Sequence, residues 1–128
     1  MERHIFQERA SGVLLHISSL PGKYGIGSLG KEAYEFVDSL ARCGVRYWQI
    51  LPIVQTGFGD SPYQSVYTGS GNPYFIDLEL LVREKLLRKS EIIGSTYKCG
   101  LIDYAKLFTE RYQILRLAFS RFDIRQKD

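Results

Sequence analysis

The stretch that decides the fold is Gly12-Val13-Leu14-Leu15-His16-Ile17, which is followed by Ser18-Ser19. A short, nearly continuous apolar run bounded by small polar residues indicates a strand that is buried on both faces. Its single polar residue is His16. A lone histidine in such a strand is more often a core residue with satisfied hydrogen bonds than a catalyst or ligand, and both interpretations remain open.

A helix and a second strand follow. Ser28 is a plausible N-cap for the helix and Gly44 its stop. The run Val45-Arg46-Tyr47-Trp48-Gln49-Ile50-Leu51-Pro52 then has the β-branched and aromatic content of a strand that proline ends. Together they predict a right-handed βαβ unit with parallel strands, in which ligands bind beyond the carboxyl ends of the strands. The predicted apolar helix face consists of Ala33, Phe36, Val37, Leu40 and Ala41.

The second strand leads into the loop Gly57-Phe58-Gly59-Asp60-Ser61-Pro62-Tyr63-Gln64-Ser65. Two glycines and a proline exclude a regular helix or central strand there. An alternative to a ligand site is a rigid turn in which Asp60 and Ser61 bond their own backbone and Tyr63 packs as a lid on the core. In a sugar site, polar side chains bond the hydroxyls and aromatic rings stack on the pyranose; the candidates are Asp60, Ser61, Gln64, Ser65, Phe58 and Tyr63.

Composition indicates one modest globular domain, with 128 residues of which 45% are apolar and 13% aromatic. Cys43 and Cys99 fit no metal or redox spacing, which suits a reducing cytosol. The start lacks the apolar core of a secretory signal, and no apolar run approaches the ~20 residues of a membrane span. We therefore expect a cytoplasmic protein without a metal and without a membrane partner.

Charge and glycine spacing argue against nucleic acids and nucleotides. Residues 1–82 hold 6 Lys and Arg against 8 Asp and Glu, whereas residues 83–128 hold 11 against 6. The basic residues after Lys98 are spread along a helical pattern with no binding motif, which predicts a solvated face. The run Gly22-x-x-Gly25-x-Gly27 matches neither the dinucleotide nor the P-loop pattern, so no nucleotide cofactor is expected.

The C-terminal part is predicted to be helical. Asp77 and Asp103 are expected as helix N-caps. A charged, glycine-containing connection covers residues 83–100, and a long amphipathic helix follows it. The helix carries a stripe, predicted to be a core face, made of Tyr104, Phe108, Tyr112, Leu115, Phe119 and Phe122.

Four motifs follow one another in the chain: Ser11-Gly12-Val13-Leu14-Leu15-His16-Ile17-Ser18-Ser19-Leu20-Pro21-Gly22, Arg46-Tyr47-Trp48-Gln49-Ile50-Leu51-Pro52, Thr56-Gly57-Phe58-Gly59-Asp60-Ser61-Pro62-Tyr63-Gln64-Ser65 and Gly71-Asn72-Pro73-Tyr74-Phe75-Ile76-Asp77-Leu78. Within a match that covers about residues 9–122, they resemble the N-terminal end of the 4-α-glucanotransferases, also called amylomaltases or disproportionating enzymes. The resemblance implies an α/β fold class: the N-terminal fragment of a (β/α)8 TIM barrel with the start of a helical insertion. Residues 1–82 would form the first βαβ part with the substrate loop, and residues 83–128 the incomplete insertion segment.

The resemblance also implies an activity, the transfer of an α-1,4-glucan segment to the 4-hydroxyl of an acceptor sugar. The implied mechanism retains configuration through a carboxylate nucleophile and a second, acid/base carboxyl group, assisted by a third acidic residue. By resemblance, Tyr63 stacks on the sugar at the cleavage site, and Ser61 and Gln64 line the same end of the cleft. Phe58 stands where the family often has a tyrosine, and Asp60 shapes the loop and contacts ligand. Maltooligosaccharides and α-1,4-glucans are the implied partners, with no cofactor.

The chain departs from the family in two ways. Val66-Tyr67-Thr68-Gly69-Ser70 replaces a family run that carries a second aromatic residue. A (β/α)8 barrel takes about 250 residues, and the family's catalytic carboxylates lie beyond the point that matches Asp128, so we expect no catalytic residue here. Glu32, Glu35 and Asp38 fall on the solvent side of the first helix.

Such a fragment is expected to be inactive alone, exposing strand edges and aromatic surface, and to be marginally stable or self-associating. Three alternatives remain open at this stage. The chain is a non-catalytic glucan-binding module, an interaction fragment that binds the missing C-terminal part of the enzyme, or part of an α-amylase-like hydrolase.

Overall fold

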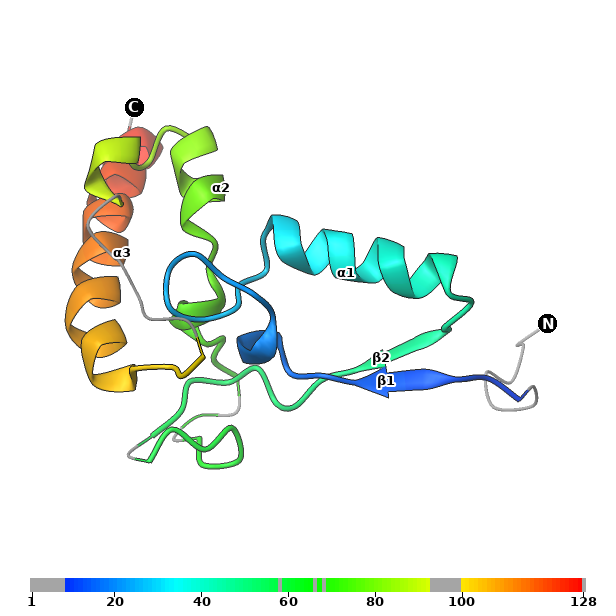
Figure 1. Ribbon diagram of the computed structural model, residues 1–128. Helices are drawn as coiled ribbons and strands as arrows, with labels where there is room; N and C mark the ends of the chain where they lie inside the picture. The colour runs from blue at the N-terminus through cyan, green and yellow to red at the C-terminus, as the bar shows by residue number, and fades with distance from the viewer. Residues whose placement is uncertain (1–8, 58, 66, 68, 93–99, 128) are drawn as a thin grey trace.

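The computed structural model describes residues 9–57, 59–65, 67, 69–92 and 100–127 (Figure 1). The described part is a mixed α/β structure. Its elements in chain order are β1 Gly12–Leu14, the 3-10 turn Ile17–Ser19, α1 Lys31–Arg42, β2 Tyr47–Gln49, the 3-10 turn Pro73–Phe75, α2 Leu78–Arg83, the 3-10 turn Lys89–Glu91, and α3 Tyr104–Lys127.

The β1–α1–β2 unit has the predicted parallel pairing, with Val13 opposite Trp48. Both strands are shorter than expected, and β1 stops at Leu14 because the chain turns into the 3-10 turn Ile17–Ser19. The prediction of a strand buried on both faces is wrong, since Leu14 is 60% exposed. The described sheet has two strands only, so no third strand covers these side chains, and the expected open edges are present.

Helix α1 begins at a different cap from the one expected. The prediction that Ser28 is the N-cap is wrong, because Gly30 occupies that position. The Ser28 hydroxyl instead donates to Asp77 Oδ2 at 2.7 Å, and a Cβ on Gly30 would overlap the same carboxylate. Gly44 ends the helix with φ +71°, as predicted.

Asp77 joins the starts of two helices. Its Oδ1 accepts from Leu80 N at 2.9 Å, which confirms the predicted N-cap of α2. Its Oδ2 receives the Ser28 hydroxyl just before α1, and the Asp77 side chain is buried. One carboxylate therefore fixes α2 against the segment that precedes α1.

The apolar face of α1 is only partly covered. Ala33 is buried, and Phe36 packs edge-on against Trp48 with ring centroids 5.0 Å apart. The Trp48 indole N–H donates to Leu15 O at 2.7 Å, which ties β2 to the end of β1. Val37 is 47% exposed and Ala41 is exposed, so the outer half of the predicted face meets no described element.

Two apolar clusters form the core, and α3 contributes to both (Figure 1). The second cluster packs α2 and the following segment on the later turns of α3. Its members lie both before and after residue 82, the expected boundary between the βαβ part and the insertion segment. Members of the first are Ile17, Leu20, Ile26, Ala33, Tyr74, Phe75 and Leu107; members of the second are Leu78, Leu86, Leu87, Ile92 and Ala118.

Asp103 caps α3 as predicted, with its Oδ1 accepting from Lys106 N at 3.0 Å. The predicted core face of this helix is right only in part, because Tyr104, Tyr112 and Leu115 pack against the two clusters while the three phenylalanines of the stripe are exposed. Among its described side chains the most deeply buried are Leu107, Arg111 and Ala118, whereas Phe108 and Phe119 of the aromatic stripe are 64% and 67% exposed. This exposed aromatic surface agrees with the expectation for an incomplete domain.

The buried side of α3 includes a cation, which explains why hydrophobic periodicity selected the neighbouring stripe. The Arg111 guanidinium donates to Tyr24 O at 3.0 Å and to Ile76 O at 3.4 Å. It thereby satisfies two carbonyl groups of loops that lie far from α3 in the sequence. Because hydrophobic periodicity counts arginine as polar, it does not identify a buried arginine that donates to backbone carbonyl groups.

A bidentate ion pair joins the turn Lys89–Glu91 to α3. The Arg121 Nη2 and Nη1 atoms donate to Glu91 Oε1 and Oε2 at 2.7 and 2.8 Å. Arg88 N also donates to Glu91 Oε2 at 2.7 Å. The bonds from Arg121, followed by the one from Arg88, lower the pKa of Glu91 from 4.5 to about 2.

The ion pair between Glu91 and Arg121 makes the stability of the fold depend on pH in the acid range. A carboxyl whose folded pKa is depressed stabilises the fold above its unfolded pKa, and this contribution is lost as pH falls from 4.5 to about 2. We therefore expect the melting temperature of Glu91→Gln to fall less steeply over this range than that of the parent, as measured by circular dichroism. Equal slopes in the two proteins would show that other carboxyl groups carry the acid dependence.

Candidate functional site

The candidate loop belongs to an excursion that leaves the body at Ile53 and returns at Asn72. Asn72 N donates to Ile53 O at 2.8 Å, which closes the base. The buried Asn72 side chain also accepts from Tyr74 N at 3.0 Å, so it fixes the returning segment of the chain to the core. The excursion follows β2 and lies near the N-terminal end of α3 (Figure 1).

Backbone hydrogen bonds shape the loop from within. Thr56 and Ser65 form an antiparallel bridge, and Gly57 N donates to Gln64 O at 2.9 Å. At the tip, Asp60 N donates to Gly57 O and Gln64 N to Ser61 O, which makes two successive turns. Asp60 has φ +56°, a conformation that aspartate tolerates better than most residues.

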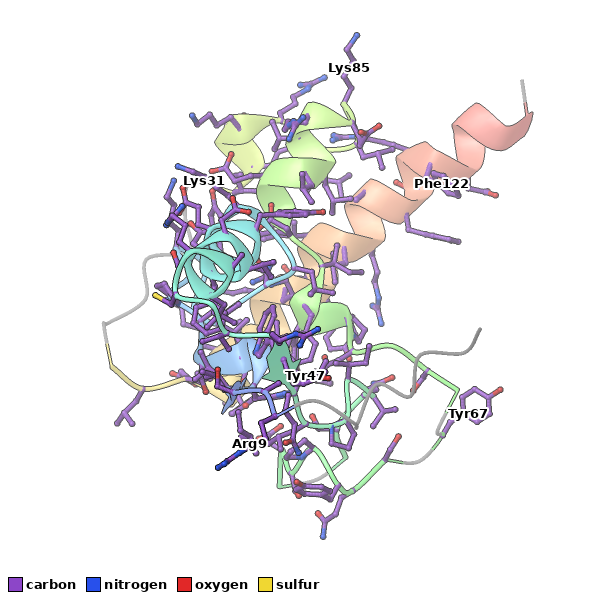
Figure 2. The ribbon with its side chains drawn as sticks, turned by 90° about the vertical axis from the view of Figure 1, so that its right-hand side faces the viewer. Arg9, Lys31, Tyr47, Tyr67, Lys85 and Phe122 are labelled. Carbon is purple, nitrogen blue, oxygen red and sulfur yellow. The ribbon has the colours of Figure 1, made fainter. Side chains whose placement is uncertain are left out.

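The side chains of the loop divide into exposed and half-buried groups. Tyr63 is 71% exposed and Gln64 is exposed, so the interpretation of Tyr63 as a lid on the core is wrong. Asp60 and Ser61 are half-buried, and Ser61 Oγ accepts from Tyr63 N at 3.4 Å, a local turn contact of the expected kind. Phe58 lies outside the described residues. Figure 2 shows Tyr67, on the same excursion, directed away from the helices.

An aromatic cluster from two elements lies under the excursion. Tyr74 packs on Tyr112 with ring centroids 5.7 Å apart, and Phe108 packs on Tyr112 at 5.3 Å. Burial, with smaller contributions from Tyr112 and Asp60, raises the pKa of Tyr74 to about 12. Burial and then Asp60 also raise the pKa of Tyr104. These hydroxyls therefore stay protonated at neutral pH, with the Asp60 carboxylate near them.

Among the described residues, one side-chain hydrogen bond joins the excursion to α3. Gln55 Nε2 donates to Tyr112 OH at 3.0 Å. Sequence reasoning placed Tyr112 on the aromatic stripe and overlooked Gln55. The two residues are 57 positions apart, so no local pattern relates them.

His16 lies just beyond the carboxyl end of β1. Its ring packs edge-on against Phe75 with centroids 5.3 Å apart, which supports a core position. The expectation that its hydrogen bonds are satisfied is wrong, since the buried Nδ1 atom has no partner among the described residues. Burial lowers the pKa of His16, which keeps the imidazole neutral at pH 7.

The glycine-rich run Gly22 to Gly27 has a structural explanation. A Cβ on Gly27 would overlap the carbonyl oxygen atoms of Ile17 and Leu20, so the close approach of two backbone segments requires glycine. Within the described residues no three His, Cys, Asp or Glu side chains gather to hold a metal ion. None of the described helices is long and apolar enough to cross a membrane.

Comparison with known proteins identifies the family. The sequence profile of the 4-alpha-glucanotransferases matches residues 15–128. This chain belongs to the 4-alpha-glucanotransferase family. A 4-alpha-glucanotransferase from Streptococcus pneumoniae serotype 4 is 52% identical over 118 residues, which are 91% of this chain and 23% of the relative. Another, from Thermus thermophilus, is 46% identical over 114 residues, which are 89% of this chain and 22% of the relative.

The solved structures agree with this membership. The amylomaltase from Streptococcus agalactiae in complex with acarbose superimposes with a TM-score of 0.86 at 46% identity. The match covers 90% of this chain and 24% of that one. The chain thus spans about a quarter of the length of the 4-alpha-glucanotransferases that it matches, and the resemblance expected from its motifs is confirmed as to family and as to an N-terminal part.

Proposed function

We propose that this chain supplies the glucan-binding loop of a cytoplasmic 4-alpha-glucanotransferase. Such an enzyme transfers a segment of an α-1,4-glucan to the 4-hydroxyl of an acceptor sugar, with retention of configuration. The observation that carries the proposal is the exposed Tyr63 ring, held on an internally bonded loop after β2 in a chain of this family. A flat ring that is already exposed and positioned suits the apolar face of a pyranose.

The other predicted residues take matching roles in this proposal. Gln64 is exposed beside Tyr63, and its amide can both donate to and accept from sugar hydroxyls. Ser61 and Asp60 form the turn beneath it and offer further oxygen atoms, and Phe58 contributes a second ring. Maltooligosaccharides and α-1,4-glucans are the proposed ligands, and no cofactor is invoked.

In this proposal the catalytic residues belong to the part of a 4-alpha-glucanotransferase that this chain does not cover. A retaining mechanism needs two carboxyl groups about 5–5.5 Å apart across the scissile bond. Several carboxylates of this chain already have structural partners: Asp77 and Asp103 cap helices, and Glu91 pairs with Arg121. We propose that residues 1–82 are the first βαβ part of a (β/α)8 barrel and that residues 83–128 begin a helical insertion.

The open side of the β1–β2 pair favours a second role, as an interaction fragment. Leu14, Tyr47 and Ile50 are 60%, 40% and 38% exposed along the strands and just beyond β2. A two-stranded parallel sheet with apolar side chains on its surface suits burial by further strands. The partner proposed here is the C-terminal part of a 4-alpha-glucanotransferase.

Maltotriose distinguishes these functions. The chain is incubated with maltotriose, first alone and then with a separately purified polypeptide that corresponds to the remaining length of a relative, and products are separated by chain length. We expect unchanged maltotriose from the chain alone, and glucose with longer maltooligosaccharides from the pair. Longer products from the chain alone would show that it carries its own catalytic carboxylates, and glucose without longer products would favour a hydrolase.

A further inference from the structure

We propose that Tyr112 of α3 is a positioning residue for the glucan-binding loop, acting through Gln55. This inference rests on the proposed function, because it concerns the same loop. The Gln55 amide donates to the Tyr112 hydroxyl at 3.0 Å. Gln55 directly precedes Thr56, whose bridge to Ser65 closes the loop that carries Tyr63.

Between the closed base residues Ile53 and Asn72, this bond is the one side-chain hydrogen bond by which the described residues of the excursion reach another element. Ser61 and Ser65 use their hydroxyls within the excursion, with Tyr63 N and Tyr67 O respectively. Backbone bonds fix the loop's internal shape, and two sets of described hydrogen bonds connect it to the rest of the chain, those at the base at Ile53 and Asn72 and the bond from Gln55. The Gln55 bond is therefore placed to decide where the Tyr63 ring faces.

Tyr112 is itself held in place on the side of α3. Its ring packs edge-on against Tyr74, which is 6% exposed, and against Phe108 on the same helix. On the neighbouring buried face of the helix, Leu107 and Arg111 lie about one turn apart and anchor the first half of α3 to the core. The hydroxyl of Tyr112 is thus a fixed acceptor supplied by an element far away in the sequence, and it transmits the position of α3 to the loop.

Variants that remove one partner of the hydrogen bond between Gln55 and Tyr112 test this proposal. Tyr112→Phe keeps the packed ring and deletes the hydroxyl, and Gln55→Met keeps the side-chain length and deletes the donor. Because one hydrogen bond is at stake, we expect each variant to weaken binding of maltoheptaose by about three- to tenfold in isothermal titration. The double variant should be no weaker than either single variant, since both remove the same bond.

Two further variants separate positioning from stability. Gln55→Glu keeps a bond in which the Tyr112 hydroxyl is the donor, so its affinity should stay near that of the parent. Tyr24→Phe removes a different tyrosine bond, to Glu79 of α2 at 2.6 Å, and should leave maltoheptaose affinity unchanged even if the melting temperature falls.

Hydrogen exchange of the sugar-free protein tests, without any ligand, whether the bond between Gln55 and Tyr112 holds the loop in place. In Tyr112→Phe the amide protons of Gly57 and Gln64 should exchange faster, whereas in Tyr24→Phe they should not. Unchanged exchange in Tyr112→Phe, or additive affinity losses in the double variant, would show that Tyr112 does not position the loop through Gln55. If exchange changes as expected but the parent does not bind maltoheptaose, the proposed glucan-binding function fails while the loop-positioning contact stands.

Discussion

Replacing Tyr63 with alanine is expected to weaken binding of maltooligosaccharides by about 30-fold or more, the cost typical of an aromatic anchor at the centre of a binding surface. The ring is 71% exposed in the free chain and packs on no described core cluster, so its loss removes binding surface without opening a cavity. Stability should therefore change by less than about 0.5 kcal/mol. Isothermal titration with maltoheptaose, together with thermal melts, measures both quantities.

Two controls show whether the ring face is what binds. Tyr63→Phe keeps the flat face and should bind within about threefold of the parent, since it loses at most one hydroxyl hydrogen bond. Tyr34 on α1 is 66% exposed, comparable to Tyr63, but belongs to another surface, so Tyr34→Ala should bind like the parent. Parent-like affinity of Tyr63→Ala would remove the central residue of the proposed site.

The second large effect concerns stability. Leu107→Ala is expected to lower the free energy of unfolding by about 2–5 kcal/mol, because it removes a fully buried side chain and leaves a cavity. Leu107 is 0% exposed and joins α3 to the cluster that contains Ile17 and Tyr74. Ordinary domains have only about 5–15 kcal/mol of stability, and this chain leaves apolar surface uncovered. Leu107→Ala should therefore be largely unfolded at 37 °C.

Urea denaturation followed by circular dichroism provides the measurement. Leu117→Ala is the matched control, on the same helix and 38% exposed, and it should cost less than about 1 kcal/mol. Equal losses in the two variants would show that α3 does not pack on the core through the Leu107 face.

Sequence reasoning succeeded where the deciding chemistry is local. Asp77 and Asp103 were predicted as caps because a carboxylate bonds an N–H two or three residues ahead, and both do so. Gly44 was predicted as a helix stop because glycine adopts positive φ without steric cost. The parallel pairing of β1 with β2 followed from the helix between them.

It failed where the deciding partner is distant. The Ser28 hydroxyl bonds Asp77, 49 residues away, and so does not cap α1. The buried face of α3 was predicted only in part, because its centre includes Arg111, whose bonds to Tyr24 O and Ile76 O depend on the tertiary fold. Similarly, that His16 Nδ1 has no partner within the described part of the chain depends on which elements surround the end of β1.

The candidate site shows the same division. Its backbone type and position after β2 were predictable from glycine, proline and the βαβ pattern. The exposure of Tyr63 was not, because either a lid or an outward ring fits the same residues. The contact between Gln55 and Tyr112 required the three-dimensional arrangement, since α3 reaches the loop only in the folded chain.

The closed base of the excursion has an evolutionary consequence. Because Asn72 N meets Ile53 O at 2.8 Å, everything between these residues begins and ends at one fixed point of the scaffold. Doubling the length of such a segment adds only about 0.6 kcal/mol of closure entropy, so insertions and exchanges there leave the helices undisturbed. On the proposed function, relatives of this scaffold would change their sugar preference by exchanging this segment while keeping Gln55, the partner of Tyr112, and protein engineers could graft it in the same way.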